Sequence, residues 1–164
     1  MIAVLDTNAV IGLAKGECLD RVRGLFREVV VPLAVRREVV EEGRGRAGAQ
    51  ELQAALGDWV REETPISHPA GVGLPALSPE DREVLALALE QGGVLVSDDV
   101  PLRREAARLD IPTLGTVQLA LLMKQQGRLE AVRPVLDLMQ ARGYHIDLAL
   151  YAEALVLAGE EEAG

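Results

Sequence analysis

Acidic side chains follow two short apolar segments of this sequence. Asp6 comes directly after the apolar run 2–5, and Asp98 and Asp99 come directly after the run 94–96. If both runs are parallel strands, their carboxyl ends lie at the same edge of a sheet, where ligands bind in open α/β folds. No basic residue lies at these strand ends to neutralise the acids. This edge is therefore the first place to look for chemistry.

Two further acids lie in segments with a helical pattern. Glu38 follows the apolar run that Pro32 ends, and Glu83 lies early in the segment that begins at Ser78. Carboxylates gathered in one cleft repel one another, and a bound divalent cation relieves the repulsion. Oxygen ligands select hard ions, so the pattern favours Mg²⁺ or Mn²⁺ over zinc.

Each acid taken alone also has a structural explanation. Asp6 is suited to cap the helix that follows it, and one member of the pair Asp98 and Asp99 is needed to cap the next helix. Asp81 completes a capping box with Ser78, a role that accounts for it without any chemistry. The functional interpretation therefore depends on the combination of acids.

The pattern predicts an α/β fold in which strands and helices alternate. Helical segments follow most of the apolar runs, and Pro or a capping residue begins several of them. We expect a three-layer α/β/α arrangement with a central, mainly parallel sheet of about four or five strands and additional C-terminal helices. The predicted strands are 2–5, 29–31, a weak one near 59–60, 94–96 and 111–114. From residue 127 onward the pattern is helical only, at about 130–142 and 148–158, before an acidic tail at 160–162.

Composition limits the classes of function. The chain has 164 residues, enough for one core, and its formal net charge of −9 argues against a protein that coats nucleic acid through a basic surface. One Trp, two Tyr and one Phe cannot form an extended stacking platform for bases. Cys18 is the only cysteine, which excludes an intrachain disulfide and favours a reducing, cytoplasmic setting. The sequence shows neither a signal-peptide pattern nor a membrane-spanning segment, so we expect no membrane partner.

Three segments in order resemble the PIN-domain (PilT N-terminus) family, the fold of VapC-like ribonucleases. They are VLDTNAVIGLAK, VVVPLAVRREVV and LSPEDREVLALALEQGGVLVSDDVPLRREAARLDIPTLGTVQLALL. The sequence after them, from GRLEAVRPVL onward, resembles the C-terminal helical extension of one PIN subfamily. The resemblance implies a PIN-like nuclease domain at 1–126. It also implies a helical extension at 127–164, packed on the same domain or at a dimer interface, with the acidic tail at its end.

The resemblance also implies roles for individual residues. The metal-binding and catalytic acids of the family correspond to Asp6, Glu38, Glu83 and Asp99, and Asp98 is close enough in sequence to share the metal. Glu83 is a departure, because the family usually has Asp there. Side chains that would bind the substrate are Thr7, Asn8, Arg36, Arg37, Arg44, Arg46, Arg103 and Arg104. Arginine suits this role because its planar fork makes paired hydrogen bonds to phosphate.

The function implied is a ribonuclease that uses Mg²⁺ or Mn²⁺ to hydrolyse phosphodiester bonds inside a chain of RNA, or of DNA. A VapC-like toxin would also have a cognate antitoxin protein as a partner, and many family members are homodimers. The alternative is a non-catalytic PIN-fold module that binds nucleic acid or protein. A response-regulator receiver and a haloacid-dehalogenase-like phosphatase fit less well, because the acids occur in the wrong order for the first. For the second, Asn8 occupies the place of a required acid.

Overall fold

The computed structural model describes residues 1–66 and 77–161. Within them, five parallel strands form one sheet in the order β3-β2-β1-β4-β5. The strands are β1 (Ile2–Leu5), β2 (Glu28–Pro32), β3 (Val60–Glu63), β4 (Val94–Val96) and β5 (Thr113–Leu114). The predicted sheet of four or five parallel strands in an α/β fold is confirmed.

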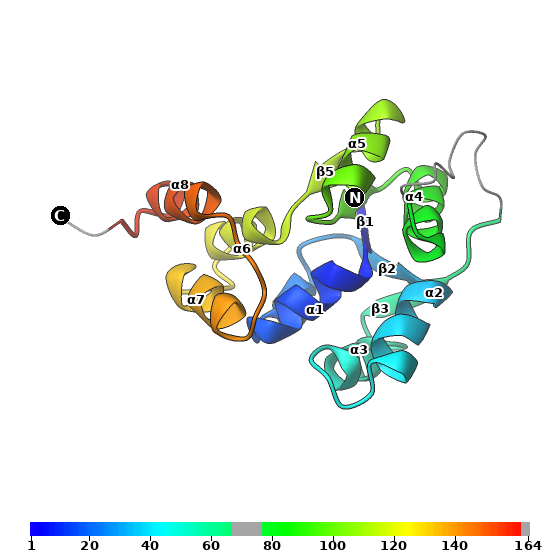
Figure 1. The fold of residues 1–164 in the computed structure, drawn as a ribbon, viewed down its shortest axis with the longest axis horizontal. Coiled ribbons are helices and arrows are strands. Elements are labelled where there is room, and N and C mark those ends of the chain that lie inside the picture. Colours follow the sequence, from blue (N-terminus) through cyan, green and yellow to red (C-terminus); the bar gives the residue numbers. More distant parts are fainter. Residues whose placement is uncertain (67–76, 162–164) are drawn as a thin grey trace.

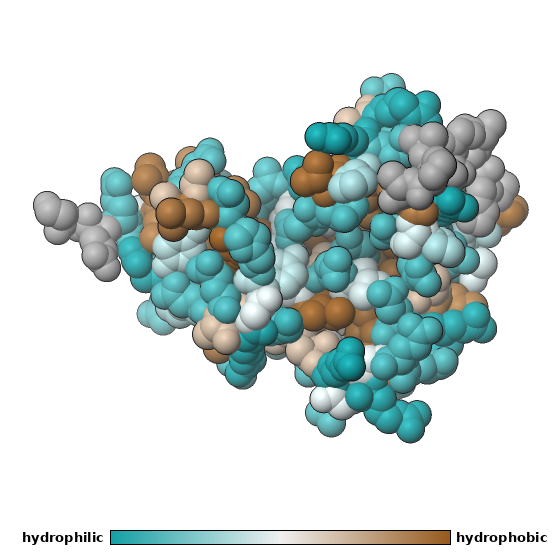
Figure 2. Space-filling view, viewed as in Figure 1, coloured by the Kyte–Doolittle hydropathy of each residue, from teal (hydrophilic) through white to brown (hydrophobic). Residues whose placement is uncertain are grey.

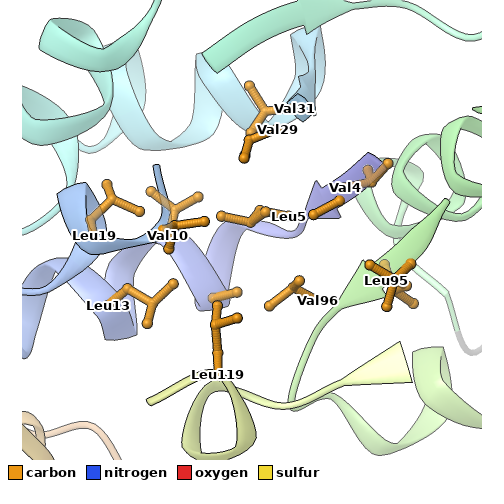
Figure 3. Packing of buried hydrophobic residues seen from close by; sticks show 14 of the residues in the cluster. Val4, Leu5, Val10, Leu13, Leu19, Val29, Val31, Leu95, Val96 and Leu119 are labelled. Atoms are coloured by element: carbon orange, nitrogen blue, oxygen red, sulfur yellow. The ribbon is translucent and has the colours of Figure 1, made fainter. Parts of the chain in front are cut away.

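The central strands are apolar without alternation because both of their faces are covered. All four residues of β1 are buried, as are Val94, Leu95 and Val96 of β4. A strand buried on both faces reads as a continuous hydrophobic run. Figure 3 shows Leu5 and Val96 among side chains of two helices, Val10 and Leu13 from α1 and Leu119 from α6. This core places the ends of β1 and β4 next to each other.

Helices lie on both sides of the sheet. Helix α4 packs against β1, β2 and β4, whereas Figure 1 shows α1 and α6 on the other side of β1. The helices are α1 (Thr7–Lys15), α2 (Leu33–Arg36), α3 (Ala49–Ala55), α4 (Pro79–Gln91), α5 (Val100–Arg108), α6 (Thr116–Gln125), α7 (Arg133–Ala141) and α8 (Leu148–Ala158). A short 3₁₀ helix, η1, covers Leu19–Val22, and a π-helical segment, η2 (Arg37–Glu42), continues α2.

The structure differs from the sequence prediction in details of two elements. The helix expected after Pro32 widens into the π-helical segment that contains Glu38, a distortion often found at functional sites. The strand expected at 111–114 pairs only over Thr113–Leu114, because Pro112 has no N–H to offer to the ladder. Residues 67–76, which fall in the predicted connection, and Glu162 of the predicted acidic tail lie outside the described residues.

The last two helices extend the molecule beyond α6. Helix α7 contacts α1, and α8 contacts α6, so the C-terminal segment packs on the same side as those helices (Figure 1). The face of the molecule that Figure 2 shows, which includes helices from both sides of the sheet, is mostly hydrophilic, with apolar residues in separate groups. None of the helices in the described part of the chain has the length and apolar character needed to cross a bilayer.

Candidate active site

Asp6 lies where β1 ends and α1 begins. Its carboxylate caps α1 by accepting a hydrogen bond of 2.7 Å from the Ala9 N–H, and only 2% of the residue is exposed. Its backbone N–H donates to the Val96 carbonyl at 3.2 Å, which ties this turn to the end of β4. The position of Asp6 is therefore fixed by two neighbouring strands and one helix.

The surroundings of Asp6 disfavour its charge. Burial raises the pKa of this carboxyl to about 7, and repulsion from Asp81 and Asp98 acts in the same direction. Hydrogen bonds from the Ser97 hydroxyl and the Ala9 N–H only partly oppose the rise in pKa. A carboxylate in this position gains from a nearby cation.

Glu38 reaches the same region from the π-helical segment. The Thr7 hydroxyl donates to its Oε2 at 3.2 Å, which connects η2 to the first turn of α1. Burial raises the pKa of Glu38, the Thr7 hydrogen bond lowers it, and repulsion from Glu80, Glu42 and Asp81 adds to the rise. Thr7 is thus placed as an orienting residue, whereas Asn8 beside it is exposed.

Asp81 also interacts with Asp6 and Glu38, although the sequence analysis explained it by capping alone. Its backbone N–H donates to the Ser78 Oγ at 3.1 Å, as the capping box predicts. Its carboxyl nevertheless belongs to the acidic group, since burial raises its pKa and repulsion from Asp99 raises it further. Because the capping role already accounts for Asp81, the sequence did not predict its interaction with the other acids. The available signal was the position of this Asp in the first turn of the helix, three residues before its apolar stretch begins at Val84.

Glu83, two residues further along α4, is placed differently. Its Oε2 is buried and has no hydrogen-bond partner in the part of the chain that the structure describes. Residues two apart on a helix do not share a face, so Asp81 and Glu83 do not present their carboxylates in the same direction. The electrostatic neighbours of Asp6 and Glu38 include Asp81. Asp81, rather than Glu83, is thus the acid of α4 that interacts electrostatically with both Asp6 and Glu38.

The two acids after β4 have separate partners. Asp99 caps α5, because its Oδ2 accepts from the Leu102 N–H at 2.9 Å. Asp98 accepts from the N–H of Thr116 at 2.9 Å and from the Thr116 hydroxyl at 2.6 Å, and the Tyr144 hydroxyl also donates to it. Asp98 therefore connects β4 to α6 and the C-terminal segment, while Asp99 repels Asp81.

The predicted phosphate-binding arginines do not form one surface group. Arg103 lies at the site, with its Nη1 donating to the Ser97 carbonyl at 2.9 Å. Arg36 is engaged in ion pairs with Glu41 and Glu62, both at 2.7 Å. The exposed members of the set are Arg37, Arg44, Arg46 and Arg104.

The donor chemistry fits a hard divalent cation better than the spacing does. All donors are carboxylate oxygens, and burial raises the pKa values of Asp6, Glu38 and Asp81, which disfavours their charges. Yet within residues 1–66 and 77–161, no three His, Cys, Asp or Glu side chains are arranged to hold a metal ion. Asp6, Asp81 and Asp99, whose carboxylates interact electrostatically, are the residues that would hold such an ion, although their carboxylates do not surround one point.

Comparisons with known proteins find a matching family model and a similar solved structure. A family model described as PIN domain matches residues 2–160, nearly the whole chain. Among solved structures, a PilT N-terminus domain protein from the hyperthermophilic archaeon Sulfolobus solfataricus P2 is similar at 16% identity and a TM-score of 0.49. That alignment covers 90% of this chain and 98% of the archaeal one. No curated protein matches the chain.

Proposed function

The chain belongs to the PIN-domain family, and from that premise we propose that Asp6, Glu38, Asp81 and Asp99 form the active site of a divalent-metal-dependent ribonuclease. A PIN domain is in general a nuclease fold, and its members usually depend on a divalent metal. The finer assignment, to RNA cut by an endonuclease with Mg²⁺ or Mn²⁺, is our own.

One observation supports the proposal above the others. Four separate segments, the ends of β1 and β4, the π-helical segment η2 and the start of α4, bring carboxylates into mutual repulsion at one sheet edge. Folding gains nothing from burying and crowding these carboxyls, and titratable groups whose pKa values are raised by burial and by like charges cluster at functional sites. The arrangement is therefore better explained by a ligand that carries positive charge.

Each residue has a defined task in this site. A divalent cation would supply an activated water and neutralise charge on the phosphate. Asp6, Asp81 and Asp99 would hold the cation, and Thr7 orients Glu38 through its hydroxyl. Ser97 fixes the loop, since its hydroxyl interacts with Asp6 and accepts from the Asp99 N–H at 3.0 Å. Arg103, held by the Ser97 carbonyl, is the arginine best placed to meet a substrate phosphate.

A second function has an observation in its favour. The absence of a ready three-ligand group among the described residues suits a PIN fold that binds nucleic acid or protein without cutting. A cytoplasmic location, a homodimer and a cognate antitoxin, as in VapC-like toxins, are further proposals. Co-purification with the product of a neighbouring reading frame would support the antitoxin.

The deciding experiment is cleavage of single-stranded and hairpin RNA, and of the corresponding DNA, with Mg²⁺ or Mn²⁺. Wild type is compared with Asp6→Asn, which keeps an oxygen to cap α1 but loses the charge. We expect the wild type to cut and the variant to be at least 1,000-fold slower, because loss of a metal ligand removes several kcal/mol of transition-state stabilisation. Equal cutting by both would indicate a contaminating nuclease and contradict the proposal.

A further inference from the structure

We call Asp6, Glu38, Asp81 and Asp99 the acidic cluster. A cavity of about 410 Å³ opens beside it. It lies between the start of α5, the start of α6 and the segment that joins α7 to α8. Residues from the nuclease-like part and from the C-terminal segment line it together, among them Arg103, Gln118, Tyr144, His145 and Leu150. Its volume is in the range of pockets that bind small organic groups.

The cavity and the acidic cluster share a wall. Asp98 lines the cavity and also repels Asp6, and Tyr144 donates its hydroxyl to Asp98. The Tyr144 ring lies against Gly12 of α1, where a Cβ would come within 2.6 Å of the ring. A group in this cavity is therefore next to whatever the acids bind.

The two acids that line the cavity already accept hydrogen bonds within the protein. Asp98 accepts from Thr116 and Tyr144, while Asp147 caps α8 by accepting from the N–H groups of Ala149 and Leu150. Arg103 donates to the Ser97 carbonyl. Since these acids already have donors, the cavity favours a neutral guest over a cation.

The remaining lining suits a flat ring with polar edges. Tyr144, His145 and Arg103 are planar groups, Val100, Ile146 and Leu150 are apolar, and Gln118 offers an amide. Aromatic and guanidinium planes stack on unpaired bases, and polar side chains hydrogen bond to their edges.

Gly115 shows that space in this wall is limited. Its φ of −88° is open to any residue, so the backbone does not require glycine. A Cβ at this position would lie 2.6 Å from Asp98 Oδ1 and 3.3 Å from Arg103 Nη1. Glycine therefore keeps Asp98 and Arg103 in place and leaves this side of the cavity open.

We propose that this cavity receives one unpaired nucleobase of a single-stranded nucleic acid whose neighbouring phosphate lies at the acidic cluster. The proposal rests on the proposed function for the position of the phosphate. A base inside a duplex is stacked and paired and cannot enter such a pocket without being extruded. The cavity thus makes single strands, loops and unpaired ends the preferred substrates.

The test measures binding of a fluorescein-labelled 12-nucleotide RNA by anisotropy in the Asp6→Asn background, which prevents cutting. Leu150→Trp fills the cavity from a residue that is 38% exposed, and Val156→Trp, on the same helix and 54% exposed, is the matched control. We expect Leu150→Trp to weaken binding about tenfold, the scale of one lost base–aromatic contact, and Val156→Trp to change it less than twofold. His145→Ala, at an exposed lining residue, is the second variant if Leu150→Trp does not fold.

An abasic scan of the same RNA locates the base. One position should lose about tenfold in affinity when its base is removed, and the loss should vanish in the Leu150→Trp background. Uniform losses below twofold at every position, or wild-type affinity in both cavity variants, would overturn the proposal. Displacement of the RNA by free AMP or UMP at concentrations below that of competing unlabelled RNA would also overturn it, because the site would then serve free nucleotides.

Cleavage of the same RNA by the wild type separates this inference from the proposed function. If affinity falls at one abasic position but the wild type does not cut the RNA in Mn²⁺, the base pocket is supported and the proposed nuclease activity is contradicted. If the wild type cuts the RNA equally well whichever base is missing, the base pocket is contradicted and the proposed nuclease activity is supported.

Discussion

Asp6 and Glu160 are acids at opposite ends of the chain, and both lose contact with water, yet their pKa values move in opposite directions. Burial raises the pKa of Asp6 to about 7, and its acidic neighbours add to the rise. Burial also disfavours the charge of Glu160. Hydrogen bonds from the N–H groups of Val132 and Arg133 and from Lys124 outweigh burial, however, and lower its pKa.

The difference lies in the donors that each carboxylate receives. Glu160 accepts from the Val132 N–H at 2.8 Å, the Arg133 N–H at 2.9 Å and Lys124 Nζ at 2.9 Å, so it joins α6, α7 and the end of α8. Within the described residues, Asp6 has donors only from Ala9 and Ser97, and Asp81 and Asp98 repel it. The Glu160 carboxylate therefore stabilises the packing of the C-terminal helices. The Asp6 carboxylate is destabilised in its charged form, and a bound cation would relieve this.

After the loss predicted above for Asp6→Asn, the largest expected effect distinguishes Asp81 from Glu83, two acids near the start of α4. Asp81→Asn should reduce metal-dependent cleavage by about 100-fold or more, because it removes a charge from the cluster. Glu83→Gln should reduce cleavage less than threefold, and kcat/KM for one RNA substrate measures both. A larger loss for Glu83→Gln than for Asp81→Asn would restore Glu83 as the metal-binding acid.

The next effect concerns Glu160, whose carboxylate already accepts several hydrogen bonds. Glu160→Gln should lower the free energy of unfolding by about 2 kcal/mol, the scale of hydrogen bonds to a charged group. Urea unfolding at pH 7 measures it, with the exposed neighbour Glu161→Gln as the control that should change little. Equal stability of the two variants would show that Glu160 is an ordinary residue of an acidic tail.

A smaller effect tests the hydrogen bond between Tyr144 of the C-terminal segment and Asp98 at the end of β4. Tyr144→Phe removes the hydroxyl that donates to Asp98 and should cost about 1 kcal/mol. Tyr151→Phe removes a hydroxyl that donates to Asp137 in an exposed place, and it should cost less than half as much. Indistinguishable melting temperatures for the two variants would contradict a special role for the Asp98 contact.

Much of the fold follows from the sequence because its signals are local. The buried runs 2–5 and 94–96 and the caps at Asp6, Ser78 and Asp99 each depend on a few neighbouring residues. The placement of the first site acids at one sheet edge follows from parallel pairing, since Leu5 is opposite Val96.

What the sequence did not show depends on contacts between distant segments. Asp81 is explained locally by its capping box, and only the packing of α4 on the sheet brings it to Asp99. Glu160 looks like part of a solvated acidic run until α7 and α8 place two backbone N–H groups and Lys124 around it. The role of Tyr144 likewise depends on a contact across 46 residues.

The central claim is that the acidic cluster costs stability until a cation binds, and unfolding of wild type and Asp6→Asn at pH 5 and pH 8 tests it most directly. The raised pKa of Asp6 means that the folded state binds its proton more tightly than the unfolded chain, whose value is 3.8. Stability is therefore lost as pH rises toward about 7 and levels off above it, by about 2–3 kcal/mol between pH 5 and pH 8. We expect Asp6→Asn to lack this loss and to be the more stable protein at pH 8, and Mn²⁺ to stabilise only the wild type. Parallel pH profiles for the two proteins, with no shift of the wild type in Mn²⁺, would contradict the account.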